Sequence, residues 1–369
     1  MTRTAVTVDR ATLNRTTLER QRLLRRADAT AVDTIQHLVG LQAQEPLEPY
    51  VGLWSRNAGF APAELVDLLQ ERQAVRTLMM RRTLHLLTRS DALRLRPAHQ
   101  AMVVQRTLGA RGRQLGGELD LDELATAAKA LFAERPRISS EVAHALADRW
   151  PGVPIDALAD VVGSLVPVVQ VPPRGIWGQR AAARNQAFSA WFGDHDPVPD
   201  EAEVLDDLVL RYLGAFGPAT SSDVRAWSGL SGLPAVIKRL RPRLRRYRDE
   251  ANRELLDLAD AELTPAETPA PPRFLPAFDN VVLGYADRIR MIDDDDRPLS
   301  IGGARFVLVD GRVAASWTST GDADSGVTVQ LELFRQLRPA ERTDLTAEAE
   351  ALAAFLGDGT SGRVTIQEP

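Results

Sequence analysis

The 369-residue sequence contains no cysteine, which excludes disulfide frameworks, thiolate zinc sites and cysteine nucleophiles. It has no apolar run near the roughly 20 residues that span a bilayer. Its first residues also lack the apolar core of a secretory signal. We therefore expect a soluble, cytoplasmic protein, and a length prior of about 100–200 residues per domain predicts two to four domains.

Lysine is almost absent: Lys129 and Lys238 are the only two, so arginine carries nearly all the positive charge. The formal net charge is −5, which argues weakly against nucleic acid. Residues 1–115, however, carry 18 arginines against 10 acidic residues. The planar guanidinium of arginine suits phosphate contacts better than an ammonium group does. Charge alone does not decide the function.

The expected secondary structure repeats along the chain: three helices followed by two strands occur three times, and a strand-rich tail follows. In the first unit, helical spacing covers residues 16–26, 30–40 and 61–75, and alternation predicts paired strands over 76–88. This order is typical of winged helix-turn-helix modules. The expected division is residues 1–115, 116–198 and 199–262 as winged-helix units, 263–272 as a proline-rich linker, and 273–369 as a β-rich domain. The predicted fold class is therefore α+β.

In the tail, alternation predicts strands over residues 273–292, 304–319 and 326–334. Asp310-Gly311 lies within the second of these and is a strong hairpin signal. A helix is expected over 339–357, and the residues after it are expected to close the sheet.

The most informative segment is residues 30–50. Gly40 and Pro46 predict that the helix over 30–40 ends before two glutamines, because glycine supplies a left-handed cap and proline favours an extended predecessor. In an extended stretch, Gln42 and Gln44 point to the same side. Two neutral amides that project together can hold a water, a sugar hydroxyl or a base edge. The alternative is that both glutamines satisfy nearby backbone groups, and their spacing alone favours this alternative.

Four segments occur in register along the chain: GLQAQEPLEPYVGLWSR, LMMRRTLHLLT, FLPAFDNVVLGYADR and FVLVDGRVAASW. Together they resemble the AlkZ/YcaQ family of bacterial tandem winged-helix DNA glycosylases, and the resemblance covers essentially the whole chain. The Q-x-Q form is similar to the AlkZ branch, since the YcaQ branch has an aspartate where this chain has Gln44.

The resemblance implies excision of bulky N7-alkylguanine from double-stranded DNA, including adducts and interstrand crosslinks left by genotoxic natural products. It implies three winged-helix units that form a C-shaped, basic channel around the duplex, and hence a protein associated with the nucleoid. The family's catalytic glutamines carry over to Gln42 and Gln44. Thr83 and His85 match its threonine-x-histidine strand near the active site. We expect a monomer that uses no metal or other cofactor and has no membrane partner.

The implied chemistry is physically consistent with two amides. N7-alkylation makes the purine cationic, so the base leaves as a neutral group and need not be protonated by the enzyme. The enzyme must position a water at C1′ and stabilise an oxocarbenium-like sugar. Because neither lysine is near the Q-x-Q motif in sequence, Schiff-base lyase chemistry is not expected. We expect a monofunctional glycosylase that leaves an abasic site.

Basic residues in two hairpins are candidates for phosphate contacts. In the first unit these are Arg76, Arg81 and Arg82, and the alternative is a solvated strand edge. The third unit contains a run of seven basic residues from Lys238 to Arg248, with a solvated helix face as its alternative. The predicted phosphate contacts in this run are Arg239, Arg241, Arg243, Arg245, Arg246 and Arg248.

Two further expectations can be tested. Asp279, in the FLPAFDN segment, is expected to have a structural role in an Asx-type turn. The rival function is a non-catalytic winged-helix protein, either a transcription regulator or a lesion-sequestering factor. A regulator usually needs dimer symmetry to bind a palindrome, whereas three units in one chain favour a monomer that wraps damaged DNA.

Overall fold

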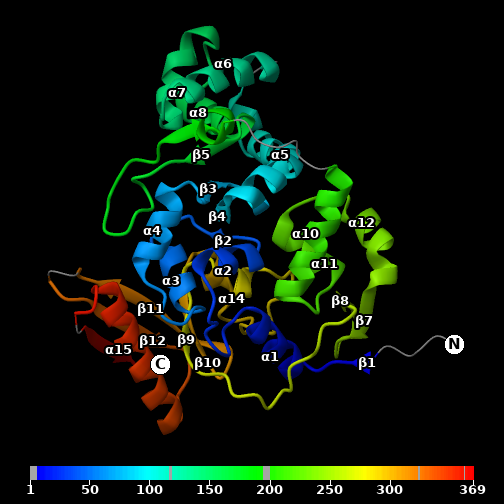
Figure 1. Cartoon of the computed structure of the whole chain (residues 1–369), viewed down its shortest axis with the longest axis vertical. Helices are drawn as coiled ribbons and strands as arrows, with labels where there is room; N and C mark the ends of the chain where they lie inside the picture. Colours follow the sequence, from blue (N-terminus) through cyan, green and yellow to red (C-terminus); the bar gives the residue numbers. More distant parts are fainter. Residues whose placement is uncertain (1–5, 116–118, 194–199, 323–324, 361) are drawn as a thin grey trace.

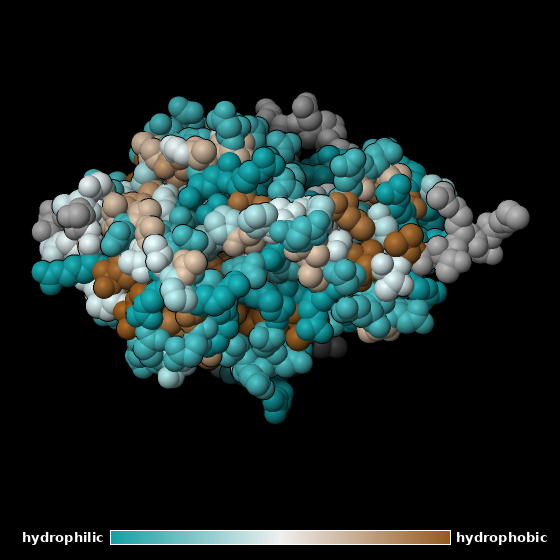
Figure 2. Space-filling model, turned by 90° about the horizontal axis from the view of Figure 1, so that it is seen from below, coloured by the Kyte–Doolittle hydropathy of each residue, from teal (hydrophilic) through white to brown (hydrophobic). Residues whose placement is uncertain are grey.

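The computed structural model describes residues 6–115, 119–193, 200–322, 325–360 and 362–369. It contains both helices and strands throughout, which confirms the predicted α+β class (Figure 1). Among these residues, no helix combines the length and the apolar character that crossing a bilayer would require. The face shown in Figure 2 is mainly hydrophilic, with hydrophobic residues scattered over it.

The first unit has the element order helix, short strand, two helices and hairpin, which is the order expected of a winged helix-turn-helix. Its elements are α2 (Ala31–His37), β2 (Leu41–Gln42), α3 (Glu48–Trp54), α4 (Pro62–Gln70), β3 (Ala74–Leu78) and β4 (Leu84–Thr88). Strand β4 lies between β2 and β3 and is antiparallel to both. The predicted strand pair and the helix that starts at Pro62 are confirmed. Helix α3 was not expected. Pro49 lies in its first turn, where the missing N–H has no cost.

Further elements of residues 1–115 lie before and after this arrangement. The strand β1 (Val6–Thr7) and helix α1 (Arg10–Arg20) precede it, and the long helix α5 (Arg89–Arg111) and the 3₁₀ turn η2 (Gly112–Gln114) follow it. The first helix was expected over 16–26 and instead begins earlier. Asp9 caps its N-terminus by accepting a hydrogen bond from the Thr12 N–H, and the backbone turns left-handed at Arg22 just beyond its end.

The second and third units repeat the same element order. The second contains α6 (Leu121–Glu134), α7 (Ser139–Leu146), η3 (Ala147–Arg149), α8 (Ile155–Leu165), β5 (Val168–Gln170), β6 (Asn185–Ala187) and α9 (Phe188–Phe192). The third contains α10 (Glu201–Phe216), α11 (Ser221–Ser228), α12 (Leu233–Leu240), η4 (Arg241–Arg243), β7 (Leu244–Arg248) and β8 (Glu254–Leu258). In each, an isolated bridge takes the place of the first strand: Arg137 pairs with Asn185, and Ala219 pairs with Leu256.

The units share their sheets with neighbouring parts of the chain. Strands β2-β4-β3-β5-β6 form one five-stranded sheet, because Arg76 of β3 pairs with Gln170 of β5. The first two units are therefore joined through their hairpins. The N-terminal β1 pairs in parallel with β7 of the third unit. The domain boundaries given above stay predictions.

The C-terminal part is a five-stranded sheet in the order β13-β12-β11-β10-β9. Its elements are β9 (Arg273–Phe274), α13 (Asn280–Leu283), α14 (Arg297–Ile301), β10 (Arg305–Val309), β11 (Arg312–Thr320), β12 (Thr328–Leu333), α15 (Pro339–Leu356) and β13 (Arg363–Gln367). The hairpin at Asp310-Gly311 is confirmed, with φ of 49° and 77° at its two residues. The predicted helix and closing strand are also present.

The strand predicted over residues 273–292 is wrong beyond Phe274. Pro276 removes a ladder donor two residues later, and Asp279 caps α13 by accepting a hydrogen bond from the Val281 N–H. The apolar residues of this segment are buried by packing against the strands rather than by alternation within one.

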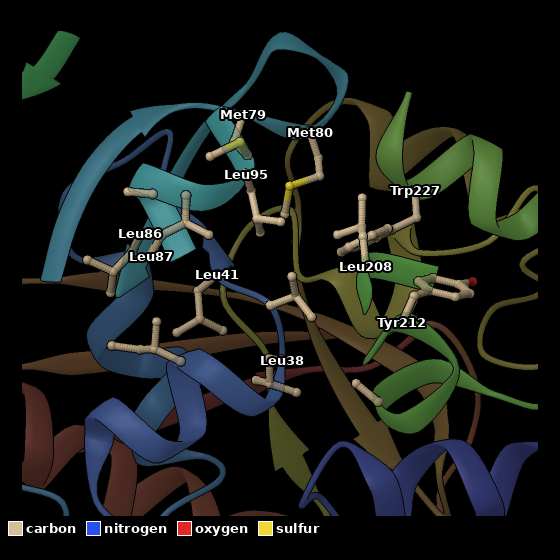
Figure 3. Close-up of a cluster of buried hydrophobic side chains, with 14 of the residues drawn as sticks. Leu38, Leu41, Met79, Met80, Leu86, Leu87, Leu95, Leu208, Tyr212 and Trp227 are labelled. Atoms are coloured by element: carbon tan, nitrogen blue, oxygen red, sulfur yellow. The ribbon is translucent and has the colours of Figure 1, made fainter. Parts of the chain in front are cut away.

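A large hydrophobic core joins the first and third units (Figure 3). Leu38, Leu41, Leu86 and Leu87 contribute to it from the first unit, and Leu208, Tyr212 and Trp227 contribute from the third. Met79 and Met80, from the turn between β3 and β4, are fully buried in the same core. The wing of the first unit therefore lies in the interior.

Candidate active site

The backbone at the end of α2 sets the direction of the two glutamines. Gly40 has φ of +95°, and a Cβ there would lie 2.8 Å from a Leu87 methyl and 2.9 Å from the Leu86 carbonyl oxygen. Glycine is therefore required, and the helix ends before the glutamines as predicted. The chain then pairs with β4, with Gln42 opposite His85, and the Ala43 N–H donates to the Leu84 carbonyl. Strand β2 ends at Gln42, which shares a face with its cross-strand partner His85, and Gln44 lies in a bend two residues beyond. A common direction of the two glutamine side chains stays a prediction.

The two amides differ in exposure. Gln42 is 7% exposed, and its Oε1 accepts a hydrogen bond of 2.7 Å from Nη2 of Arg81. Gln44 is exposed, and its Oε1 accepts a hydrogen bond of 3.0 Å from the Leu84 N–H. Guanidinium and backbone N–H groups only donate, so both contacts must be made by the amide oxygens. The NH₂ groups of the two side chains and the second lone pair of each oxygen remain for other partners.

Arg81 lies at the tip of the first unit's wing, in the 3₁₀ turn η1 (Met80–Arg82). Arg81 and Arg82 have left-handed φ of 58° and 63°, values that non-glycine residues adopt at a cost of about 1–3 kcal/mol each. Besides Gln42, the Arg81 guanidinium donates to the Trp227 carbonyl at 2.6 Å and to Asn280 Oδ1 at 2.9 Å. Burial, together with nearby cationic groups, lowers the pKa of Arg81 to about 10, so the group stays charged at neutral pH. The predicted phosphate contact does not fit Arg81, because its guanidinium is directed inward.

His85 of β4 lies directly opposite Gln42 of β2, so their side chains share a face. Thr83, just before β4, contacts the His85 ring, as the spacing of the two residues predicted. His85 is fully buried, and its Nδ1 lies 3.0 Å from the Thr83 carbonyl oxygen and 3.4 Å from Thr83 Oγ1. A carbonyl only accepts, so Nδ1 carries the proton and Nε2 keeps a lone pair. Burial, and secondarily the charge of Arg81, lowers the pKa of His85 to about 3. This imidazole is therefore neutral at physiological pH, and its Nε2 has no partner among the described residues.

The other two predicted arginines of this hairpin have different environments. Arg76 is 1% exposed and donates from Nη2 to the carbonyl of Ala43 at 2.7 Å. The predicted phosphate contact therefore does not fit Arg76 either; the side chain supports the backbone between Gln42 and Gln44. Arg82 is partly exposed and forms a 3.5 Å ion pair with Asp160.

The basic run of the third unit lies on α12, η4 and β7, where it was expected, and most of its arginines have partners within the chain. Arg239 pairs with Asp206 at 2.5 Å, and Arg241 pairs with Glu254 at 2.5 Å. Arg246 lies 3.8 Å from the same Glu254. Two more make local contacts: Arg245 with the Tyr247 hydroxyl and Arg248 with Asn252. Arg243 is exposed and makes no hydrogen bond or ion pair with any other described residue. The run is thus a surface group of partly neutralised charge, away from the Q-x-Q contacts.

Sequence reasoning missed several residues around Gln42. Asn280 follows Asp279 directly, yet only its contact with Arg81, 199 positions away in sequence, brings it to the site. Asp279 itself is structural, as expected: it caps α13 and forms a buried bidentate pair with Arg56 at 2.8 and 2.9 Å. His99 of α5 is also fully buried, with Nδ1 2.8 Å from the Leu95 carbonyl and Nε2 unpartnered among the described residues.

The arrangement offers neutral hydrogen-bonding groups rather than ionised catalysts. Gln42 and the neutral imidazole of His85 are cross-strand partners, Gln44 contacts the backbone of the adjacent Leu84, and a partly buried guanidinium holds the Gln42 amide. The described residues contain no group of three His, Asp or Glu side chains that could hold a metal. Such a site can orient a water molecule without changing its own protonation state near neutral pH.

Comparisons with known proteins agree with this geometry. A family model described as DNA glycosylase AlkZ-like matches residues 35–355. Among solved structures, the chain is similar to the Streptomyces sahachiroi DNA glycosylase AlkZ, with a TM-score of 0.78 and 22% sequence identity over 98% of this chain and 100% of that chain. No curated protein matches the chain significantly in sequence. The family match covers most of the chain and includes all the residues described above around Gln42.

Proposed function

Because the chain belongs to the AlkZ-like DNA glycosylase family, we propose that it is a monofunctional glycosylase that hydrolyses the N-glycosidic bond of bulky N7-alkylguanine in double-stranded DNA. The observation that supports this most directly is that two amides lie beside the start of β4: Gln42, buried and held by Arg81, is opposite His85, and the exposed Gln44 accepts from the Leu84 N–H. Repair of damage by genotoxic natural products, or self-resistance to them, is the role that fits such a substrate. Unhooking of interstrand crosslinks belongs to the same proposal.

In this proposal, both amides hydrogen-bond to a single water molecule. Gln44 is accessible to the substrate, whereas Gln42 lies deeper and is held by Arg81. A water between them accepts a hydrogen bond from an amide NH₂ and donates one to the free lone pair of an amide oxygen. In that position its oxygen is directed at C1′, and the fixed geometry lowers the entropic part of the barrier. The C1′–N9 bond breaks, the electron pair leaves with the cationic base, and the base departs neutral. The water oxygen forms the new bond to C1′, and the proton that it then loses passes to solvent, because neither amide is a base near neutral pH.

His85 supports this water rather than a phosphate. A neutral imidazole carries no charge to attract an anion, but its Nε2 lone pair lies on the Gln42 face and can accept a hydrogen bond. Thr83 fixes the ring through its carbonyl oxygen. We therefore assign His85 to the hydrogen-bond network around Gln42, and Thr83 to positioning it.

The chemistry of the site favours a substrate that is already activated. An aspartate at position 44 would add basicity and stabilise the sugar cation, and a neutral Gln44 does neither. The enzyme should therefore prefer cationic N7-alkylated bases over unmodified purines. Neither Lys129 of α6 nor Lys238 of α12 contacts the site residues, which is consistent with hydrolysis without Schiff-base formation.

DNA is held, in this proposal, as a duplex in a C-shaped channel lined by the three units, with the protein acting as a monomer. Arg82 and the third unit's basic run remain the proposed phosphate contacts: Arg239, Arg241, Arg243, Arg245, Arg246 and Arg248. Arg243 has no internal partner among the described residues and is the strongest of these candidates. The family assignment favours an enzyme over the non-catalytic alternative.

The test is base release from duplexes that carry N7-methylguanine or a large N7 adduct. Wild type should release the modified base and leave an alkali-labile abasic site, and borohydride should trap no covalent complex. Removing one oriented hydrogen-bonding group from a transition state costs about 10²–10³ in rate, so Gln42→Ala and Gln44→Ala should each be slower by about that factor. Gln367→Ala, an exposed glutamine on β13, is the matched control. Normal release by the double variant would remove the catalytic assignment, and no release by wild type would favour the non-catalytic alternative.

A further inference from the structure

Arg81 is a cation in an unusual setting. It is partly buried, and no carboxylate among the described residues forms an ion pair with it. Its guanidinium instead donates to three neutral oxygens: Gln42 Oε1, Asn280 Oδ1 and the Trp227 carbonyl. Burying a charge without a counter-ion is unfavourable for stability. A contact that stability does not require is a candidate for function.

The backbone around Arg81 is built to direct this side chain inward. Left-handed φ at two consecutive arginines is strained, and the strain persists because the wing tip is held from several sides. Arg106 of α5 donates to the Arg81 carbonyl at 2.9 Å. Gly229, just after α11, has φ of +78°, and a Cβ there would lie 3.1 Å from the Arg81 Cα. Two parts of the chain, α5 and the turn after α11, thus hold the Arg81 backbone in place.

We propose that Arg81 is a positioning residue: it holds the Gln42 carboxamide in one orientation, and Asn280 holds Arg81. This inference rests on the proposed function of Gln42. A glutamine amide turns about its last torsion between orientations of similar energy. The charge-assisted hydrogen bond removes that freedom, because only the oxygen can face the guanidinium. The NH₂ group is thereby directed away from Arg81, which leaves it available to the water.

Arg81 therefore contacts Gln42 inside the protein instead of a DNA phosphate, and the two roles have different consequences for an Arg81 variant. A residue that binds phosphate should change affinity for DNA and its dependence on salt. A residue that acts only through Gln42 should change the chemical step and leave affinity nearly constant. It should also lose its effect once Gln42 is gone.

The experiment is a double-mutant cycle measured by single-turnover base release. Losing a hydrogen bond to a charged group corresponds to about 10- to 100-fold in rate, so Arg81→Met should be slower by that factor, with the Kd for lesion duplex within about two-fold of wild type. In the Gln42→Ala background, the same change should have no further effect. In the Gln44→Ala background it should cost the full factor, because Gln44 does not contact Arg81.

A second variant and a spectroscopic measurement test the role of Arg81 even if Arg81→Met folds poorly or releases base too slowly to measure. Asn280→Ala leaves both Arg81 and Gln42 unchanged, and it should slow release less than Arg81→Met but in the same Gln42-dependent way. The side-chain amide resonance of Gln42, assigned by its loss in Gln42→Ala, should shift in both variants. Arg81→Lys, which restores a charged donor, should recover part of the rate.

The outcomes separate this inference from the proposed function. No base release by wild type would defeat the proposed function itself. Release by wild type that depends on Gln42, combined with additive losses in the cycle, weaker DNA binding and an unmoved Gln42 resonance, would overturn the role of Arg81 alone.

Discussion

Lowering the pH from about 7.5 to about 5 should destabilise the protein through two buried imidazoles. Burial lowers the pKa of His85 to about 3 and that of His99 to about 4, below the ordinary value of 6.5. Between these values, the unfolded chain binds protons that the folded chain does not. The contribution of each neutral imidazole is therefore fully present above pH 6.5 and is lost progressively as the pH falls.

The expected size follows from the two pKa values. At about pH 5, protonation of the unfolded chain costs about 2 kcal/mol of unfolding free energy for each histidine, and about 4 kcal/mol for both. The measurement is urea unfolding followed by tryptophan fluorescence, at both pH values, in wild type, His85→Gln and His99→Gln. The loss between the two pH values should be smaller by about 2 kcal/mol in each variant than in wild type.

Two controls make the comparison specific. His37 is also partly buried, and burial lowers its pKa too, but it is present in every protein compared and cancels. His144→Gln, at an exposed histidine of α7, is the matched control for the substitution itself. Equal pH-dependent losses in wild type and both buried-site variants would refute the neutral state of His85 and His99 in the folded protein, and with it the role assigned to His85.

Three further predictions concern stability and DNA binding. Asp279→Asn should lower the unfolding free energy by about 3–5 kcal/mol, because it leaves the buried Arg56 unpaired; a loss under about 1 kcal/mol would contradict that reading. Gly40→Ala should destabilise the first unit by about 1–3 kcal/mol and also slow base release, since the Cβ meets β4 at a left-handed φ; an unchanged melting temperature would count against this. Substituting Arg243, Arg246 and Arg248 together by alanine should reduce the slope of log affinity against log salt by up to about 3. The same slope as wild type would remove these residues from the DNA interface.

Much of the local structure could be predicted because its causes are local. The turn at Asp310-Gly311, the helix that starts at Pro62 and the end of α2 before the glutamines each depend on the conformational preference of one or two residues. The extended backbone at Gln42, opposite His85, followed from the same local signals. The strand expected over residues 273–292 failed where Asp279 caps a short helix, and alternation of apolar residues gives no sign of that.

The candidate site shows where local reasoning stops. The sequence by itself determined that the helix ends before Gln42 and that extended backbone follows, because glycine and proline act on the local backbone. It did not determine which arginines meet DNA and which enter the core. In the sequence, nothing next to Arg76 and Arg81 distinguishes them from surface arginines. The direction of the Arg81 side chain depends on residues far along the chain, Trp227 and Asn280. The direction of a side chain at a left-handed turn depends on the residues that pack against the turn. For Arg81 these residues come together only when the first and third units pack against each other.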